Sequence, residues 1–590
     1  MKMKNIRFIL LLVITSLVFG CDDKLNVAPD GGSITEDQLT EVINNDPSKL
    51  QSEVNGLYSI MKAWPATTGS GSYQEDFGIP GIAAKTDHNG QDIVGDVTGY
   101  NWFSGEQDLT NRNFTYRAPR VVWNQFYMQI RTANSIIGKI DRATTDPIGK
   151  SYLGQALAVR AYDYFNLVQL FQFTYVGNQD KPAVPIITDE TPVDSLTMNP
   201  RKTVAEVYAL IIKDLNDAIG YLGGDDIPAR PDVSAVNLAI AYGLRARVNL
   251  VMQNWDAAAS DAAKALTESG QSPMSMQAVS VPTFDDVTEP GIMWGCIITT
   301  TDDATTSGIC NFTSMCTNLC FGYGGYTTLV GTWKKVNKLL YDQIPATDVR
   351  KGWFLDENYE AAALKGYEDS GEAASAFNEW FGEPYSPDYG PIWDVFGMEP
   401  YTSVKFAPTN KQLTYPENSD DFPLMRASEM ELIIAEAKGM GGDLGAGKAA
   451  LESYVQTYRD PDFVSTAASA QELQDEVWLQ RRVEFWGEGI SWFDLMRLNK
   501  PAIRYKEVDG KIVTNYGALA IFNIPADAPY RLWPIPQKEI QTNEGISDAD
   551  NNDMGTLPTS LPVPGAMKRA PVKEFGFVKS ITGLQDSSPF

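Results

Sequence analysis

One stretch of the chain, Gly154 to Gln172, is apolar around the whole circumference of a helix. Its polar residues recur at every third position from Arg160 to Gln169. On a helix of about 3.6 residues per turn such a row drifts by roughly 60° per step and forms no solvent face. An all-round apolar helix is either a membrane span or a buried core helix. Because Arg160 and Asp163 lie inside the stretch, a span is disfavoured. The pattern therefore predicts a central buried helix within layers of other helices.

Helical periodicity returns on both sides of this stretch and predicts a mostly α protein. Asn254 and Trp255 form a short turn between two helical segments, and the second segment is rich in alanine, which lets two helices approach closely. This arrangement is similar to a tetratricopeptide hairpin. Capping patterns support the helix starts, each a Ser or Thr followed three residues later by Glu: Thr203 with Glu206, Ser428 with Glu431, and Ser469 with Glu472. We expect a helical-repeat scaffold made mainly of residues 47–64, 120–268 and 424–498.

Two long segments lack this periodicity and predict irregular, loop-rich structure. Residues 66–117 are rich in Gly, Asp, Thr and aromatic side chains, and residues 269–421 contain one strand-like run, 291–300. The region 499–590 is rich in proline and is expected to wrap the surface. We interpret residues 35–590 as one domain that carries both irregular excursions.

The N-terminus has the pattern of an export signal. Basic residues precede the apolar run from Phe8 to Phe19, which is too short for a comfortable transmembrane helix. Gly20 and Cys21 then resemble a bacterial lipobox, although that pattern prefers a small residue at Phe19. We interpret residues 1–20 as a signal peptide and residues 21–34 as a flexible tether. Cys21 would become the first mature residue and carry acyl chains such as palmitate; several chains anchor a protein stably.

Composition and charge narrow the range of ligands. Hydrophobic residues make up 43% of the chain and charged residues 21%, as in a soluble globular protein. The formal net charge of −27 argues against binding to nucleic acid, which requires Lys and Arg to neutralise phosphates. It favours neutral or cationic ligands.

The remaining four cysteines lie within one short region: Cys296, Cys310, Cys316 and Cys320. In an exported chain this grouping predicts disulfides, for which three pairings exist. A zinc site with four thiolates is the alternative, but the C-x-x-C pairs typical of such sites are absent.

No familiar catalytic motif is present in the sequence. His88 is the only histidine, and Asp87-His88-Asn89-Gly90 indicates a polar turn rather than a catalytic group. The charged cluster Arg481, Arg482, Glu484 and Glu488 has helical spacing and is expected to form structural ion pairs. A glycosidase needs only two suitably spaced carboxylates, so a hydrolase stays open as an alternative.

Aromatic residues in the two excursions are the remaining functional signal. Exposed aromatic rings offer flat apolar faces on which sugar rings can stack, while neighbouring Asp, Asn and Gln side chains bind hydroxyl groups. The alternative is that these rings hold the long loops against the helices.

At this point several motifs together resemble the SusD/RagB family of surface lipoproteins. The resemblance extends over almost the entire chain and is carried by the lipobox with Asp22-Asp23, Asn55-Gly56-Leu57-Tyr58, residues 123–140, Arg160-Ala161-Tyr162 with Phe165, Asn254-Trp255, Asp348-Val349-Arg350, Arg426 with Ala435-Glu436-Ala437, Arg481-Arg482-x-Glu484-Phe485 through Gly487-Glu488-Gly489 to Trp492-Phe493-Asp494-Leu495-Met496-Arg497, and Leu532-Trp533-Pro534-Ile535-Pro536.

The resemblance implies a non-catalytic, outer-membrane glycan-binding protein that partners a TonB-dependent, SusC-like transporter. It also implies a ligand site on loops after the first helix and within the central insertion, which are the two excursions. We expect Tyr73, Trp102, Tyr323 and Tyr326 to contact ligand. The alternatives are a peptide-binding, RagB-like uptake protein and a surface glycan hydrolase. No cofactor is predicted; bound calcium stays open, because the Asp-rich loops could hold it although they lack the ligand order of an EF-hand.

Overall fold

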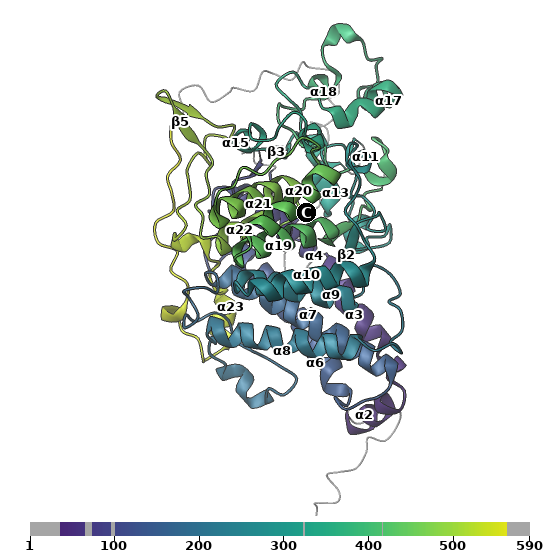
Figure 1. Cartoon of the computed structure of the whole chain (residues 1–590), viewed down its shortest axis with the longest axis vertical. Helices are drawn as coiled ribbons and strands as arrows, with labels where there is room; N and C mark the ends of the chain where they lie inside the picture. The colour runs from purple at the N-terminus through teal and green to yellow at the C-terminus, as the bar shows by residue number, and fades with distance from the viewer. Residues whose placement is uncertain (1–35, 65–72, 96–100, 322–324, 416, 563–590) are drawn as a thin grey trace, which may run out of the picture.

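The computed structural model describes residues 36–64, 73–95, 101–321, 325–415 and 417–562. Long helices stack in layers through the middle of the molecule (Figure 1). Helix α2 (Glu36–Asn45) lies at one end of the long axis, and a lobe containing α17 (Glu372–Phe381) and α18 (Ile392–Val395) lies at the other. The predictions for the signal peptide and tether, for Tyr323 and for the end of the C-terminal tail concern residues outside these ranges.

The scaffold consists of helices that pack on one another in succession. Helix α6 packs on α7, α7 on α8, α9 on α10, α10 on α19, and α19 on α20 and α21. This arrangement confirms the mostly α fold with a helical-repeat scaffold. The bounds are α3 (Gln51–Lys62), α6 (Arg117–Lys139), α7 (Pro147–Phe171), α8 (Val204–Leu222), α9 (Leu238–Val251), α10 (Trp255–Ser269), α19 (Ala427–Met440), α20 (Leu444–Tyr458), α21 (Ala470–Glu484) and α22 (Ser491–Arg497).

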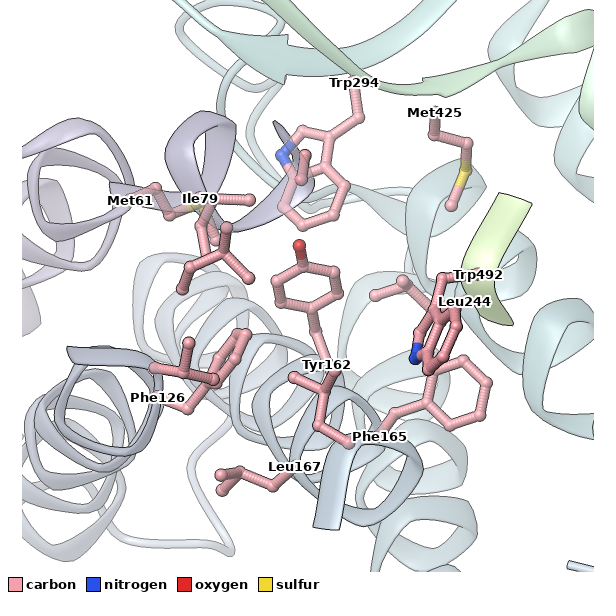
Figure 2. Close-up of a cluster of buried hydrophobic side chains, with 14 of the residues drawn as sticks. Met61, Ile79, Phe126, Tyr162, Phe165, Leu167, Leu244, Trp294, Met425 and Trp492 are labelled. Atoms are coloured by element: carbon pink, nitrogen blue, oxygen red, sulfur yellow. The ribbon is translucent and has the colours of Figure 1, made fainter. Parts of the chain in front are cut away.

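Helix α7 is the predicted central helix and is buried on every side. Leu167 is fully buried, and Tyr162 meets the Trp294 ring edge-on at 5.1 Å between centroids. Figure 2 shows Tyr162 and Phe165 among side chains from several other elements, including Phe126 and Trp294. The all-round apolar pattern therefore corresponds to a helix enclosed by its neighbours.

The two charged residues in the buried part of α7, Arg160 and Asp163, are accommodated differently. Arg160 donates to Asp214 at 2.7 and 2.8 Å and to Asp189 at 2.7 Å, so its charge is paired inside the core. Asp163 is fully buried, and neither carboxyl oxygen has a hydrogen-bond partner among the described residues. Burial raises the pKa of Asp163 well above its usual range, which favours the neutral form of this carboxyl.

The insertion between α10 and α19 has short helices and a hydrophobic core of its own. The core contains Phe321, Trp333, Phe377 and Trp393, against which half-buried rings such as Trp380 pack. The helices are α11 (Met276–Val279), α12 (Asp303–Thr306), α13 (Phe312–Cys316), α14 (Tyr326–Val330), α15 (Lys338–Tyr341), α16 (Lys365–Asp369), α17 and α18.

Short 3-10 helices occur along the described chain. They are η1 (Pro47–Leu50), η2 (Val193–Met198), η3 (Val349–Trp353), η4 (Ala362–Leu364), η5 (Pro387–Tyr389), η6 (Thr409–Lys411), η7 (Pro529–Arg531) and η8 (Asp548–Asp550).

Two antiparallel strand pairs join distant parts of the chain, and a third is a local hairpin. The predicted strand 291–300 is present as β2 (Ile292–Cys296), which pairs with β4 (Phe422–Arg426) at the entry to α19. Strand β1 (Ile93–Val94) pairs with β3 (Lys335–Val336), and β5 (Lys506–Val508) pairs with β6 (Lys511–Val513). The β1–β3 pair brings the two excursions together.

Several predicted boundaries need correction. Residues 66–117 are not wholly irregular, because α4 (Gly78–Asn89) is buried along its entire length in the main core; a short helix, α5 (Ser104–Gln107), follows. Ser428 lies inside α19 rather than at its N-cap, and its hydroxyl accepts a hydrogen bond from Arg459. Thr203 and Ser469 cap α8 and α21 as predicted.

The C-terminal region also reaches deeper than a surface wrap. Trp533 is fully buried, and its backbone N–H donates to the carbonyl of Leu170 at the end of α7. The short helix α23 (Gln537–Thr542) follows it. Among the residues that the structure describes, no helix has the length and apolar character needed to cross a bilayer.

Candidate ligand-binding site

An aromatic surface lies in the first excursion, close to its contact with the second. Tyr73 is 49% exposed, and its ring stacks on Trp102 with 5.9 Å between centroids and 29° between planes. The guanidinium of Arg117 lies 4.2 Å from the centre of the Tyr73 ring. We call these three side chains the aromatic platform. The structure thus brings together two of the four predicted ligand-binding residues.

The backbone beneath Tyr73 is fixed from two sides. The indole Nε1 of Trp64, just beyond α3, donates to the Tyr73 carbonyl at 3.0 Å. The Asp76 carboxylate accepts from the Tyr73 N–H at 3.3 Å, and the Asp76 N–H donates back to the Tyr73 carbonyl at 3.2 Å. These contacts fix the backbone that carries the Tyr73 ring before any ligand arrives, which lowers the entropy cost of binding.

A buried charge cluster supports the platform. The ammonium of Lys85 lies 3.5 to 3.6 Å from carboxylate oxygens of Glu75, Asp76 and Glu106, and Arg117 pairs with Asp76 and lies 3.8 Å from Glu75. Burial raises the pKa of Glu75, while Lys85 opposes this shift. Because Glu75, Asp76 and Glu106 are buried and paired with cations, they position the platform rather than face a substrate.

His88 does not lie in a polar turn, so that part of the prediction is wrong. It occupies the last turn of α4, is 1% exposed, and stacks on Phe103 with 4.9 Å between centroids. Burial, helped by the positive charge of Lys334, lowers the pKa of His88 to about 3, so the ring is neutral at physiological pH. A buried neutral imidazole stacked in the core is structural.

The other two predicted ligand-binding residues are Tyr326 and Tyr323. Tyr326 lies at the start of α14 and is buried in the main hydrophobic core, unlike the half-exposed Tyr73, so a contact between Tyr326 and ligand stays a prediction. Tyr323 lies outside the described residues. Most aromatics of the second excursion, such as Trp333 and Trp393, instead fill its own core.

The predicted disulfides are not formed. Cys296, Cys310, Cys316 and Cys320 are all free and buried. Burial raises the pKa of each thiol, and Cys320 donates to Asn418 at 3.1 Å. The four residues act as small buried side chains. Within the described ranges no group of three His, Cys, Asp or Glu residues is arranged to hold a metal ion.

The charged cluster of α21 is structural, as predicted, but its partners are distant in sequence. Arg481 pairs with Asp494 and Arg482 with Asp92. Glu484 accepts from three arginines: Arg350, Arg426 and Arg459. A cavity of about 100 Å³ lies beside this cluster, bordered by α7 and α22.

Sequence reasoning missed Trp64 and Arg117, which position and border the platform. No local motif marks either residue, because Arg117 is the first residue of α6 and Trp64 follows the end of α3. Their roles depend on the Tyr73 backbone and ring, which only the tertiary fold brings to them.

Comparison with known families accounts for both halves of the scaffold. Residues 35–250 match a SusD-like family described as starch-binding and associating with the outer membrane, and residues 341–552 match the SusD family. A SusD-like protein of Formosa agariphila is 23% identical over 529 residues, which cover 85% of this chain and 92% of that protein.

Solved structures share the fold over nearly their whole length. A SusD-like carbohydrate-binding protein of Bacteroides vulgatus has a TM-score of 0.66 at 19% identity and covers 86% of this chain and 98% of its own. A SusD superfamily protein of Bacteroides thetaiotaomicron has a TM-score of 0.63 at 20% identity, with 86% and 99% covered. A laminarin-binding SusD-like protein has a TM-score of 0.54 at 18% identity, with 84% and 98% covered. The two family matches, which together cover more than half of the chain, and the shared fold show that this chain belongs to the SusD/RagB family.

Proposed function

We propose that this protein is a non-catalytic surface lipoprotein of the outer membrane that binds glycan and delivers it to a SusC-like, TonB-dependent transporter. The observation that carries the proposal is the half-exposed Tyr73 ring, stacked on Trp102 and fixed in place by Trp64 and Asp76. A fixed aromatic face suits the apolar faces of sugar rings.

The chemistry around Tyr73 favours binding over turnover. Arg117 lies over the Tyr73 ring at the border of the platform, and its charge is balanced by Asp76. The carboxylates nearest the platform are buried in the Lys85 cluster. A glycosidase needs an acid and a second carboxylate that both reach the scissile bond, and this cluster offers neither to a bound sugar.

Relatives support a carbohydrate ligand. One structural relative is described as a carbohydrate-binding protein and another as laminarin-binding, and one of the two family matches is described as starch-binding. The net charge of −27 is compatible with a neutral glycan.

The proposed location follows from the N-terminal sequence. Lipid attached to Cys21 would hold the protein at the membrane, and residues 21–34 would let it move relative to a neighbouring transporter. Delivery to a transporter is consistent with the family description of proteins that associate with the outer membrane.

The proposal is tested with soluble protein that begins after Lys24, applied to an array of glycans and peptides. We expect binding to glycans, with no release of shorter products after prolonged incubation. Binding to peptides alone would support the RagB-like alternative, and release of shorter glycans would support the hydrolase.

A further inference from the structure

A cleft lies along α3, separate from the aromatic platform, and it is larger than the cavity beside the α21 charged cluster. It has a volume of about 640 Å³, within the range of about 300–1,000 Å³ typical of ligand sites. Exposed Gln51, Asn55 and Ser59 of α3 form one wall, and the loop 228–232 forms the other. We call it the α3 cleft.

The floor of the α3 cleft is a chain of hydrogen-bonded polar groups. The Tyr58 hydroxyl donates to Gln155 Oε1 at 2.6 Å and accepts from the Val236 N–H at 3.0 Å. Gln155 in turn donates to the Ser151 hydroxyl at 3.0 Å. Because these groups satisfy one another, the floor keeps its shape without a ligand.

Two charged side chains on the loop wall, Arg230 and Asp232, have polar atoms that form no hydrogen bond with a described group. Arg230 donates through Nη1 to backbone carbonyls, the shortest at 2.9 Å to Met293, and within the described chain its Nε and Nη2 donate to no acceptor. Asp232 accepts from Ser234 through Oδ1, and no described group donates to its Oδ2. The wall therefore offers a donor pair and a free carboxylate oxygen, with no net charge between them.

We propose that the α3 cleft is a second carbohydrate-binding site, for a neutral oligosaccharide. Each sugar hydroxyl both donates and accepts hydrogen bonds, so it is matched by a wall that combines a guanidinium, a carboxylate, amides and a serine hydroxyl. The balanced charge of Arg230 and Asp232 favours a neutral ligand over an ionic one. This inference rests on the proposed function and extends it from one site to two.

The two sites can serve one long glycan chain. Lys62 borders the cleft, and Trp64, which holds the Tyr73 backbone, follows it closely in sequence. The cleft therefore reaches the end of α3 from which the platform is positioned. Linked contacts at two sites strengthen binding of a long chain far more than that of a short one.

The experiment uses isothermal titration calorimetry with neutral gluco-, manno-, galacto- and xylo-oligosaccharides of two and of eight units. Ser59→Trp fills the cleft from its exposed wall, and Ser52→Trp places the same ring on an exposed α3 position that does not line the cleft. Arg230→Lys removes the free guanidinium edge. Thermal melts confirm that each variant is folded.

We expect Ser59→Trp to weaken binding of the eight-unit ligand by at least about tenfold, with little effect from Ser52→Trp. Arg230→Lys should also weaken binding of the eight-unit ligand. If Ser59→Trp and Arg230→Lys bind as wild type does while Tyr73→Ala abolishes binding, the second site is refuted and the proposed function stands. If no neutral oligosaccharide binds wild type, the inference is overturned, and the array of glycans and peptides decides the proposed function separately.

Discussion

The carboxylate of Glu484 is the centre of the buried ion network that joins the end of α21 to β4, η3 and the end of α20. It accepts from Arg426 at 2.7 Å, from Arg459 at 2.7 Å and from Arg350 at 3.2 Å. These three guanidiniums are at most 2% exposed. Burial alone would raise the pKa of Glu484, but the arginines hold it well below its usual range. The side chain is therefore ionised at neutral pH, and Glu484→Gln removes a real charge without changing its shape.

The cost of Glu484→Gln follows from the arginines that it leaves without a counter-charge. Breaking a buried ion pair by removing one partner costs about 3–5 kcal/mol. Arg426 keeps Glu488 and Arg350 keeps Asp348, whereas Arg459 has no other carboxylate among its hydrogen-bond partners in the described chain. We therefore expect a loss of about 3–5 kcal/mol, a large part of a typical total stability of about 5–15 kcal/mol.

Urea unfolding followed by circular dichroism measures this loss as a lower midpoint with an unchanged slope. Asp475→Asn is the control, because Asp475 lies on the same helix but forms an exposed pair with Lys500. Such surface pairs contribute about 0–1 kcal/mol. If Glu484→Gln costs no more than Asp475→Asn, the network does not stabilise the fold as argued.

Three further predictions concern the core, the pH dependence and the anchor. Leu167→Asp should prevent folding, because it places an unpaired carboxylate in the fully buried face of α7, at a cost of several kcal/mol; an unchanged melting temperature would contradict this. Burial raises the pKa of Asp87 to about 8, even though the Gly489 N–H donates to it, so its contribution to stability is largest below pH 4 and is lost as the pH rises from about 4 to 8. Asp87→Asn should remove this dependence, up to about 1.4 kcal/mol per pH unit, and melting curves of wild type and variant that stay parallel between pH 5 and 7 would argue against it. Cys21→Ala should give a folded protein that membranes no longer retain, and recovery in the membrane fraction equal to wild type would exclude the lipid anchor.

The scaffold could be predicted from the sequence because each of its helices depends on residues that are close together in the chain. The burial of α7 follows from apolar residues around one helix, and the caps at Thr203 and Ser469 depend on residues three positions apart. The predicted N-cap at Ser428 was wrong because the same spacing occurs inside α19, where the Ser428 hydroxyl accepts a hydrogen bond from Arg459.

The excursions were harder to predict because their contacts are distant in sequence. The sequence around Asp92 does not indicate that its ion-pair partner is Arg482, 390 positions away. Tyr73 and Tyr326 both lie in aromatic, glycine-containing stretches, yet one is half-exposed and the other belongs to the core. The thiols near Cys320 likewise gave no sign that burial, rather than oxidation, accounts for them.

Trp102 is a less decisive test of the ligand site than the sequence suggested. It is half-buried against the main core, so Trp102→Ala would lower both affinity and stability. Tyr73 separates the two effects better, because half of its side chain is exposed. Tyr242 on the scaffold helix α9 provides a matched control, since it too has an arginine over its ring, Arg245 at 5.5 Å.

The affinity of Tyr73→Ala for the glycan identified on the array, measured by calorimetry beside Tyr242→Ala, tests the central claim most directly. Stacking on an aromatic ring contributes about 1–3 kcal/mol by analogy with base stacking, so Tyr73→Ala should bind roughly five- to a hundredfold more weakly, with an unchanged melting temperature. Tyr242→Ala should bind as wild type does. Equal affinity of wild type and Tyr73→Ala would contradict a glycan site at the aromatic platform.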